Sequence, residues 1–268
     1  MWGNCSRCGI PHGKDRTAIG HLLGIALKKH TNSGKKDNAT PLFDWGKYYE
    51  KNGKKLLILG IALLVMFAIW TGLVQCVDVQ PAGPSGTEIG FATFNCWFHR
   101  VTGVHMAIYT ITDWLGLGPI LVCMAFGGMG WTQLIKRKSL FKVDRDLIFL
   151  GIYYVVVIWG YLIFEMIPIN YRPILIAGML EASYPSSTTL LVLSVMPTLI
   201  YQVNHRSTNL LLRRFVCVMS IIFSVFMVIG RLVAGVHWFT DIVGAVILST
   251  GLYCLYKVMV LLFCDDKY

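Results

Sequence analysis

Long apolar stretches separated by short polar segments dominate this chain. Six of them are candidates for membrane helices: residues 56–77, 114–134, 147–167, 188–203, 215–236 and 242–263. A membrane helix needs about 20 mostly apolar residues; the second stretch is rich in glycine, and the fourth is short and contains Pro197. Backbone inside a bilayer must satisfy its own hydrogen bonds. The pattern therefore predicts an all-α polytopic membrane protein whose six transmembrane helices and short loops occupy residues 54–268.

Composition and charge agree with this prediction and orient it. Hydrophobic residues make up 55% of the 268 residues, and only 14% are charged. Of the 24 Lys and Arg residues, only Arg100, Arg172 and Arg231 fall on one side of the predicted membrane. By the positive-inside rule, both termini are expected in the cytoplasm. The net charge of +10 is then mostly a topology signal. Because no basic run is interleaved with base-stacking aromatic residues, no nucleic-acid partner is expected.

Residues 1–53 form a basic extension ahead of the membrane domain. No apolar core with a cleavage site precedes the first predicted span, so this segment does not resemble a signal peptide. Residues 18–27 have a modest apolar face, which either lies on anionic lipid or belongs to a disordered tail. Cys5, Cys8 and His12 resemble half of a zinc site but lack a second ligand pair. We therefore expect no metal there.

The longest predicted connection is the outer loop, residues 78–104. Its first part is rich in Gly and Pro, and its second part is aromatic. A loop of this length between spans often has a role, and a lid or a half-inserted helix that helps to recognise lipid are both compatible with the pattern. Cys76 and Cys96 lie on or near the same outer face, where a disulfide between them is one alternative.

The most informative polar positions are Arg231, His237 and Asp241, in the stretch GRLVAGVHWFTD between two apolar segments. Ionisable groups at the edge of a membrane span are costly and indicate a functional site. A carboxylate four residues after a histidine can orient the imidazole and support its positive charge, as activation of a nucleophile requires. A nearby arginine suggests a phosphate. The alternative is a water-exposed turn with an arginine that reaches toward the membrane surface.

Two further segments lie at span ends on the same side, so all three can meet over one cavity. Pro185, Ser186, Ser187 and Thr188 stand at the start of a predicted span, where proline and hydroxyl residues favour a helix N-terminus. Its N–H groups and helix dipole can bind an anion, although the same residues also suit a simple helix cap. Arg172 can fork two phosphoryl oxygens or, alternatively, anchor the chain at lipid headgroups.

The order of these residues resembles the type 2 phosphatidic acid phosphatase superfamily. That family carries three motifs: K-x6-RP, PSGH and SR-x5-H-x3-D. Here Arg172 is followed by Pro, Ser186 is preceded by Pro, and the third motif is present from Arg231 to Asp241. The resemblance covers about residues 147–263, and the third motif is its most specific part. It implies a six-span membrane lipid phosphatase with its site on the extracytoplasmic face.

The resemblance also implies a role for each matching residue. His237 would be the nucleophile that forms a phosphohistidine, and Asp241 would orient it. Arg172, Arg231 and Ser186 would hold the phosphoryl oxygens. The resemblance implies no cofactor and no metal, and the outer face has no carboxylate cluster suited to magnesium.

Three positions depart from the family motifs. Gly230 replaces the serine before the arginine of the third motif, Glu165 stands at the lysine position, and Thr188 stands at the histidine position of PSGH. The histidine of that motif protonates the leaving oxygen. A leaving phosphate monoester has a second pKa of about 6 and can depart without a proton. A simple alkoxide is strongly basic and needs a proton to leave. The departures therefore favour a lipid diphosphate, such as an isoprenoid (polyprenyl-type) diphosphate.

A replacement acid is an alternative to this leaving-group argument. Glu165 or Glu181 could donate a proton if poor solvation raised its pKa. His99 and His105 lie in the outer loop and could also approach the cavity.

The sequence thus predicts an integral-membrane lipid phosphatase of the plasma membrane, acting on a lipid phosphate or diphosphate. Two other classes stay open. A degenerate site could bind lipid phosphate or serve lipid transport, and an acceptor other than water would make the protein a headgroup phosphotransferase. The exact lipid and the oligomeric state are not determined by the sequence.

Overall fold

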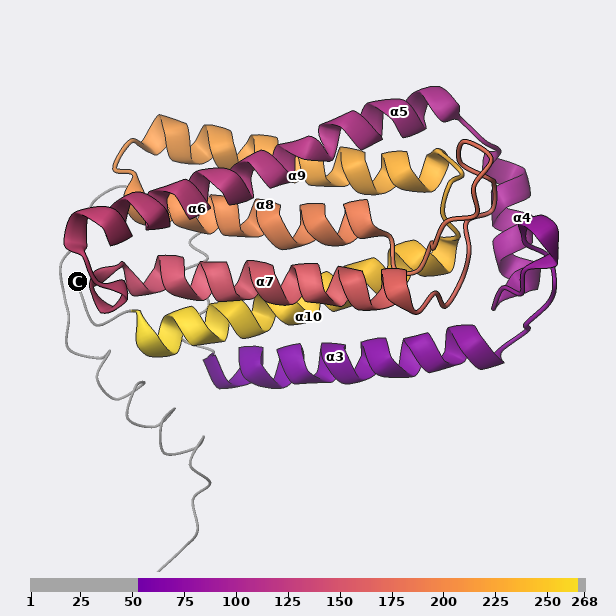
Figure 1. Cartoon of the computed structure of the whole chain (residues 1–268), viewed down its shortest axis with the longest axis horizontal. Coiled ribbons are helices and arrows are strands. Elements are labelled where there is room, and N and C mark those ends of the chain that lie inside the picture. The colour runs from indigo at the N-terminus through magenta and orange to yellow at the C-terminus, as the bar shows by residue number, and fades with distance from the viewer. Residues whose placement is uncertain (1–52, 265–268) are drawn as a thin grey trace, which may run out of the picture. The chain divides into compact units, whose positions relative to one another are not determined.

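Helices make up nearly all the regular structure of residues 53–264, the part of the chain described by this computed structural model (Figure 1). The α-helices are α3 (Gly53–Cys76), α4 (Ala92–Thr102), α5 (Met106–Leu115), α6 (Leu117–Arg137), α7 (Arg145–Met166), α8 (Ser187–Arg206), α9 (Leu210–Val233) and α10 (Phe239–Phe263). Short 3-10 helices form at η2 (Pro84–Gly86) and η3 (Leu140–Lys142). Residues 53–264 contain isolated β-bridges but no strand, so the all-α prediction is confirmed for this part.

Five stretches of helix within residues 53–264 are long and apolar enough to cross a membrane. They are α3, α5 together with α6 (Met106–Arg137), α7, α9 and α10. The predicted fourth span, residues 188–203, lies on α8, which does not reach that apolarity. Yet α8 runs alongside the others and packs against α6, α7, α9 and α10 (Figure 1). A multi-pass membrane protein is supported, while the count of six spans stays a prediction.

Polar residues of α8 are buried against other helices, which explains its lower apolarity. The hydroxyls of Thr198 and Tyr154 are 2.7 Å apart, and the hydroxyl of Tyr153 donates to the carbonyl oxygen of Ser194 at 3.2 Å. A polar group away from water must find a partner, and here α7 supplies it. α8 is therefore surrounded by other helices, and a search for long apolar stretches does not detect such a helix reliably.

Glycines allow α3 and α10 to pack closely. A Cβ added at Gly60 would lie 2.9 Å from Cδ2 of Leu255 and 3.3 Å from the carbonyl oxygen of Gly251. Small residues let membrane helices approach, and dispersion contacts then stabilise the pair. This packing holds α10, which carries part of the candidate site, against the first described helix.

Replacing Gly60 by valine should destabilise the protein by about 1–3 kcal/mol, because the added methyl groups overpack this contact. Thermal unfolding of the purified protein in detergent measures the effect. Gly72→Val is the matched control, since it lies on the same helix with no atom within 4 Å of an added Cβ. Equal losses in both variants would attribute the effect to helix propensity instead of packing.

The outer loop, residues 78–104, contains an amphipathic helix. α4 lies across the end of the bundle (Figure 1). The ring centroids of Phe94 and Phe98 are 5.3 and 5.2 Å from that of Phe239 at the start of α10. Trp97, on the same helix, is 55% exposed. The aromatic half of the loop thus packs on the bundle while part of it faces outward.

Cys76 and Cys96 are both free thiols, so the disulfide alternative is wrong. Cys96 packs instead against Ile89, Ala92 and Trp238, in a small apolar cluster beneath α4. Cys76 is exposed at the end of α3.

An ion-pair network ties the helices together at the end of the bundle opposite the outer loop. Arg206 contacts Asp146 at 2.5 Å and Asp144 at 3.3 Å, and Arg137 contacts Asp144 at 2.8 Å. The network joins the turn between α6 and α7 to the last turn of α8. Both arginines belong to the basic side predicted to face the cytoplasm, and that orientation stays a prediction.

Several predictions for the extension lie outside the described residues. They concern residues 18–27 and the group Cys5, Cys8 and His12.

Candidate active site

Two loops and two helix starts converge at the end of the bundle near α4. The loop between α7 and α8 folds back on itself, because the N–H of Arg172 donates to the Glu181 carbonyl at 3.1 Å and that of Ser183 donates to the Asn170 carbonyl at 2.9 Å. The N–H of Ser186 donates to the backbone oxygen of Asp241 at 3.2 Å. The start of α8 and the start of α10 are therefore fixed to each other and to the loop.

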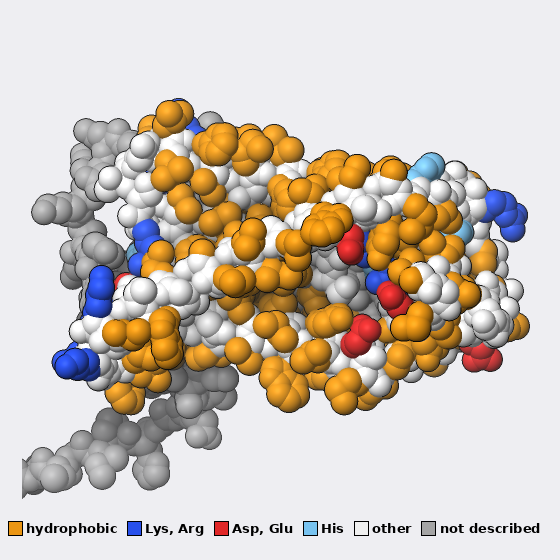
Figure 2. Space-filling view, turned by 45° about the horizontal axis from the view of Figure 1, so that its top comes forward, with side chains coloured by type: hydrophobic (Ala, Val, Ile, Leu, Met, Phe, Trp, Pro, Cys, Tyr) orange, Lys and Arg blue, Asp and Glu red, His pale blue; other side chains and the backbone are white. Residues whose placement is uncertain are grey.

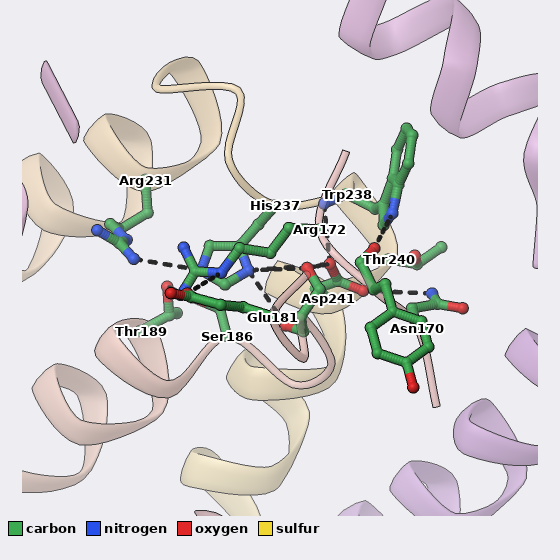
Figure 3. A network of polar contacts seen from close by, with 12 residues as sticks. Asn170, Arg172, Glu181, Ser186, Thr189, Arg231, His237, Trp238, Thr240 and Asp241 are labelled. Atoms are coloured by element: carbon green, nitrogen blue, oxygen red, sulfur yellow. Dashed lines mark hydrogen bonds and ion pairs between the residues drawn. The ribbon is translucent and has the colours of Figure 1, made fainter. Parts of the chain in front are cut away.

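The contacts of His237 define which of its ring nitrogens carries the proton. Nδ1 lies 3.1 Å from the carbonyl oxygen of Ser183 and 3.1 Å from its Oγ. A carbonyl oxygen only accepts, so Nδ1 is the donor. Nε2 then keeps its lone pair, and Nη2 of Arg231 lies 3.3 Å from it (Figure 3). The ring nitrogen with an available lone pair is therefore Nε2, which faces a guanidinium group.

Asp241 acts on the ring mainly through Ser183. Its Oδ2 accepts from Ser183 Oγ at 2.5 Å and from the N–H of Trp238 at 2.8 Å, and Oδ1 accepts from Asn170 at 3.4 Å. The distance from Oδ2 to Nδ1 of His237 is 3.9 Å, longer than a hydrogen bond. The carboxyl group thus fixes the serine that in turn holds the imidazole, with its own charge close by.

Ser183 and Asn170 were not identified from the sequence. Each lies two residues before a residue of a recognised segment, Pro185 and Arg172 respectively, and a serine or asparagine in a loop carries no distinguishing spacing. The only available signal was their location in the two segments predicted to meet on the outer face.

Two buried arginines have donors without hydrogen-bond acceptors. Arg231 is 1% exposed and Arg172 is 9% exposed, and Nε and Nη1 of both make no hydrogen bond. Nε of Arg172 lies 3.1 Å from Oε2 of Glu181, and Nη1 of Arg231 lies 3.6 Å from Oδ1 of Asp113, close enough for ion pairing but without hydrogen-bond geometry. Buried donors left unfilled are unusual in proteins. Their arrangement suits an anion with several oxygens, such as a phosphoryl group.

Burial and the nearby positive charges keep the imidazole neutral. Desolvation, followed by the charges of Arg172 and Arg231, holds the pKa of His237 well below its usual 6.5. A neutral ring retains the Nε2 lone pair at neutral pH, which nucleophilic attack requires.

A cavity of about 250 Å³ opens next to the histidine. Its lining includes Tyr161, Phe164, Glu165, Arg172, Glu181, Ser187 and His237. Figure 2 shows acidic side chains beside a recessed basic one in a face that is otherwise largely hydrophobic. The space is large enough for a small headgroup.

The remaining residues predicted for the site take different positions. Ser186 lies beside His237 (Figure 3), but its buried hydroxyl donates to Oγ1 of Thr189 at 3.1 Å. Ser187 lines the cavity, whereas Thr188 is half-buried next to Gly116, at the junction of α5 and α6. The start of α8 thus contributes N–H groups and Ser187, while the Ser186 hydroxyl has a protein partner.

Two of the four candidate acids line the cavity and two do not. Glu165, at the end of α7, is exposed and lines the cavity, as does Glu181. Nε2 of His99 is 3.0 Å from the Gly235 carbonyl, and Nε2 of His105 is 2.9 Å from that of Thr102. Neither histidine belongs to the cavity lining. Of these four candidate acids, the two glutamates are the ones that line the cavity.

Fold and site together define a helical membrane protein with two buried arginines beside a neutral histidine, an arrangement suited to a membrane phosphatase. The chain belongs to the PAP2 superfamily, whose family model matches residues 120–263, more than half of its length. This confirms the family resemblance of the motifs. The site residues Arg172, Arg231, His237 and Asp241 all lie within the matched region.

The fold is similar to a solved structure from the same superfamily. That structure is a transmembrane PAP2-type phosphatidylglycerolphosphate phosphatase from Bacillus subtilis, with a TM-score of 0.57 and 17% sequence identity. The similarity covers 78% of this chain and 98% of that one. At this identity it supports the fold and not the substrate. A comparison with curated proteins returned no match.

Proposed function

We propose that this protein removes the phosphoryl group of a membrane lipid through a phosphohistidine on Nε2 of His237. The observation that carries the proposal is the lone pair of Nε2 beside two guanidinium groups with unfilled donors. Nε2 attacks phosphorus, the bond between phosphorus and the leaving oxygen breaks, and a phosphohistidine forms. Water, or the hydroxyl of an acceptor lipid, then attacks phosphorus and releases the histidine.

Each neighbouring group has a part in this reaction. Arg172 and Arg231 bind the equatorial phosphoryl oxygens and stabilise the charge that develops on them. As Nε2 bonds to phosphorus, positive charge develops on the imidazole. The Nδ1–H bond to Ser183 and the nearby carboxyl group of Asp241 stabilise that charge and hold the ring orientation, as the third group of a nucleophile–base system does.

The leaving group has little help from the protein. Thr188 has no titrating proton to offer, and a positioned general acid is usually worth about 10²- to 10⁴-fold. We therefore favour a substrate whose leaving group departs unprotonated, such as a lipid diphosphate. Glu165 is the alternative acid, because it lines the cavity.

We also place this site on the extracytoplasmic side. Among the arginines and lysines of the chain, Arg100, Arg172 and Arg231 are the ones on this side of the predicted spans. The opposite end carries the basic turns, which remain in the cytoplasm in most membrane proteins.

Trapping of the intermediate tests the proposal. A lipid diphosphate radiolabelled on its terminal phosphorus is mixed with the purified protein, quenched in base, and the protein digested. Acid-labile label on the peptide that contains His237 is expected. Phosphate release without such label would exclude the covalent mechanism. Lipid binding without label or release would favour a binding or transport protein.

The part of the acid inhibition that comes from His237 should begin below pH 6.5, because the pKa of His237 is lowered by burial and then by Arg172 and Arg231. The neutral ring is the active form, so activity falls as pH drops through that lowered pKa. Removing one positive charge in Arg172→Gln should raise the pKa and move the acidic limb to higher pH. The pH profile of kcat/KM measures this shift. An unmoved limb would show that another group controls it.

A further inference from the structure

Carboxylates surround the cationic part of the site. Glu165 and Glu181 line the cavity together with Arg172, and Asp113 approaches Arg231 to 3.6 Å. Figure 2 shows acidic side chains near a recessed basic one on a largely hydrophobic face. The acidic groups therefore belong to the surroundings of the bound ligand and not to a remote solvated surface.

The charged side chains around the cavity are not those expected for a site that binds only a phosphate. With His237 neutral, the two guanidinium groups have the carboxyl groups of Glu165, Glu181 and Asp113 around them, in addition to the buried Asp241, so the carboxyl groups outnumber the cations before an anion enters. Like charges brought together in a partly desolvated site repel each other. Yet Nη1 of Arg172 is buried, makes no hydrogen bond and belongs to a side chain that lines the cavity. The site thus offers an anion position and, beside it, an excess of negative charge.

Glu181 and Asp113 are each ion-paired with one arginine, whereas Glu165 is paired with neither. Glu181 reaches Nε of Arg172 without hydrogen-bond geometry, and its side chain is 38% exposed. Glu165 forms no ion pair with any residue of 53–264 and is exposed to the cavity. If both served only to position Arg172, hydrogen bonds to its guanidinium would be expected.

We infer that the ligand is a lipid phosphate that carries an ammonium group a few atoms from its phosphorus. Its phosphoryl oxygens contact Arg172 and Arg231 beside His237, and its ammonium group faces Glu165 and Glu181. Tyr161 and Phe164 line the same cavity, and aromatic faces attract cations. The phosphoryl half of this inference rests on the proposed function, whereas the ammonium half rests on the carboxylates.

Such a ligand also suits a site without the usual acid. A positive charge close to the ester oxygen lowers the basicity of the departing alkoxide, so the leaving group needs less protonation. A polyprenyl diphosphate meets the leaving-group requirement but leaves the two glutamates without a cation. An aminoalkyl phosphate supplies that cation and has a less basic leaving group than a simple alkyl phosphate, although its alkoxide is still far more basic than a departing phosphate.

Binding of two matched phosphonates tests the ammonium position. The probes are a long-chain 2-aminoalkyl phosphonate and its N-acetyl derivative, titrated calorimetrically into the detergent-solubilised full-length protein. The amine is expected to bind about tenfold more tightly, a preference typical of a few charge contacts. Glu165→Gln and Glu181→Gln should each reduce this preference at least about threefold. Glu88→Gln, an exposed glutamate outside the cavity lining, should leave it unchanged.

The ratio of the two affinities, amine over N-acetyl derivative, decides the outcome. A substitution that changes the size of the cavity or releases Arg172 from Glu181 affects the phosphonate end of both probes, so this effect cancels in the ratio. Equal binding of both probes, binding of neither, or a preference unchanged in both glutamine variants would overturn the inference. Phosphate release from the corresponding phosphate esters is measured in parallel. Absence of release with the amine preference intact would reject the hydrolytic function while supporting the ammonium position.

Discussion

His237→Ala should reduce phosphate release from the lipid substrate by about 10⁴-fold or more, the size of effect seen when an enzyme loses its nucleophile. Nε2 carries a lone pair 3.3 Å from Nη2 of Arg231, beside the arginine donors that make no hydrogen bond. The loss should appear in kcat, and the acid-labile label should vanish with it. Steady-state phosphate release in mixed micelles measures the change.

His105→Ala provides the matched control for this prediction. Its imidazole is exposed on the same end of the molecule and contacts only a backbone oxygen, that of Thr102. Activity within about threefold of the unmodified protein is expected, as for most surface substitutions. Residual activity above one per cent in His237→Ala, with a normal unfolding temperature, would contradict the assigned nucleophile.

A lipid diphosphate should be hydrolysed about 10²- to 10⁴-fold faster than the monophosphate with the same chain, the range that a general acid contributes. The reason is the leaving group, because a phosphate monoester departs without the proton that an alkoxide requires. Comparison of kcat/KM for the two lipids, neither of them carrying an amine, tests this. A preference for the monophosphate would exclude the argument.

Thr188 does not itself line the cavity, but a histidine at this position has a longer side chain and stands at the family's acid position. Thr188→His should therefore raise monophosphate turnover while leaving diphosphate turnover nearly unchanged. Thr188→Gln is the control, since it adds bulk and polarity without a group that titrates near neutral pH. An equal increase in both variants would attribute the effect to shape. If the monophosphate is already a good substrate and Glu165→Gln removes that activity, Glu165 is the working acid.

The hydrophobic pattern located well those helices that are apolar along most of their length. The predicted segment 56–77 corresponds to α3 (Gly53–Cys76), and 242–263 lies within α10. The pattern was least informative for α8, whose buried Thr198 hydroxyl pairs with that of Tyr154 on α7. Helices inside a bundle need apolar character less than helices against lipid do, because their polar groups find protein partners.

The site was only partly predictable. Spacing alone identified His237 and Asp241, because four residues along one segment bring side chains to one side. It suggested a direct contact, whereas the structure separates Nδ1 and Oδ2 by 3.9 Å and places Ser183 between them. Ser183 lies 54 positions from His237 and 58 from Asp241 along the chain, so no periodic pattern in the sequence indicates this contact.

By itself, the sequence determined that this is a helical membrane chain with the third motif of its family and with Glu165 and Thr188 at two altered positions. Those conclusions depend on local properties: apolar length, charge and the spacing of residues. Only the tertiary structure decided which nitrogen of His237 holds the lone pair, which arginine donors remain unfilled and which carboxylates share the cavity. These features arise from contacts between distant segments, whose distances and burial are set by packing and not by order along the chain.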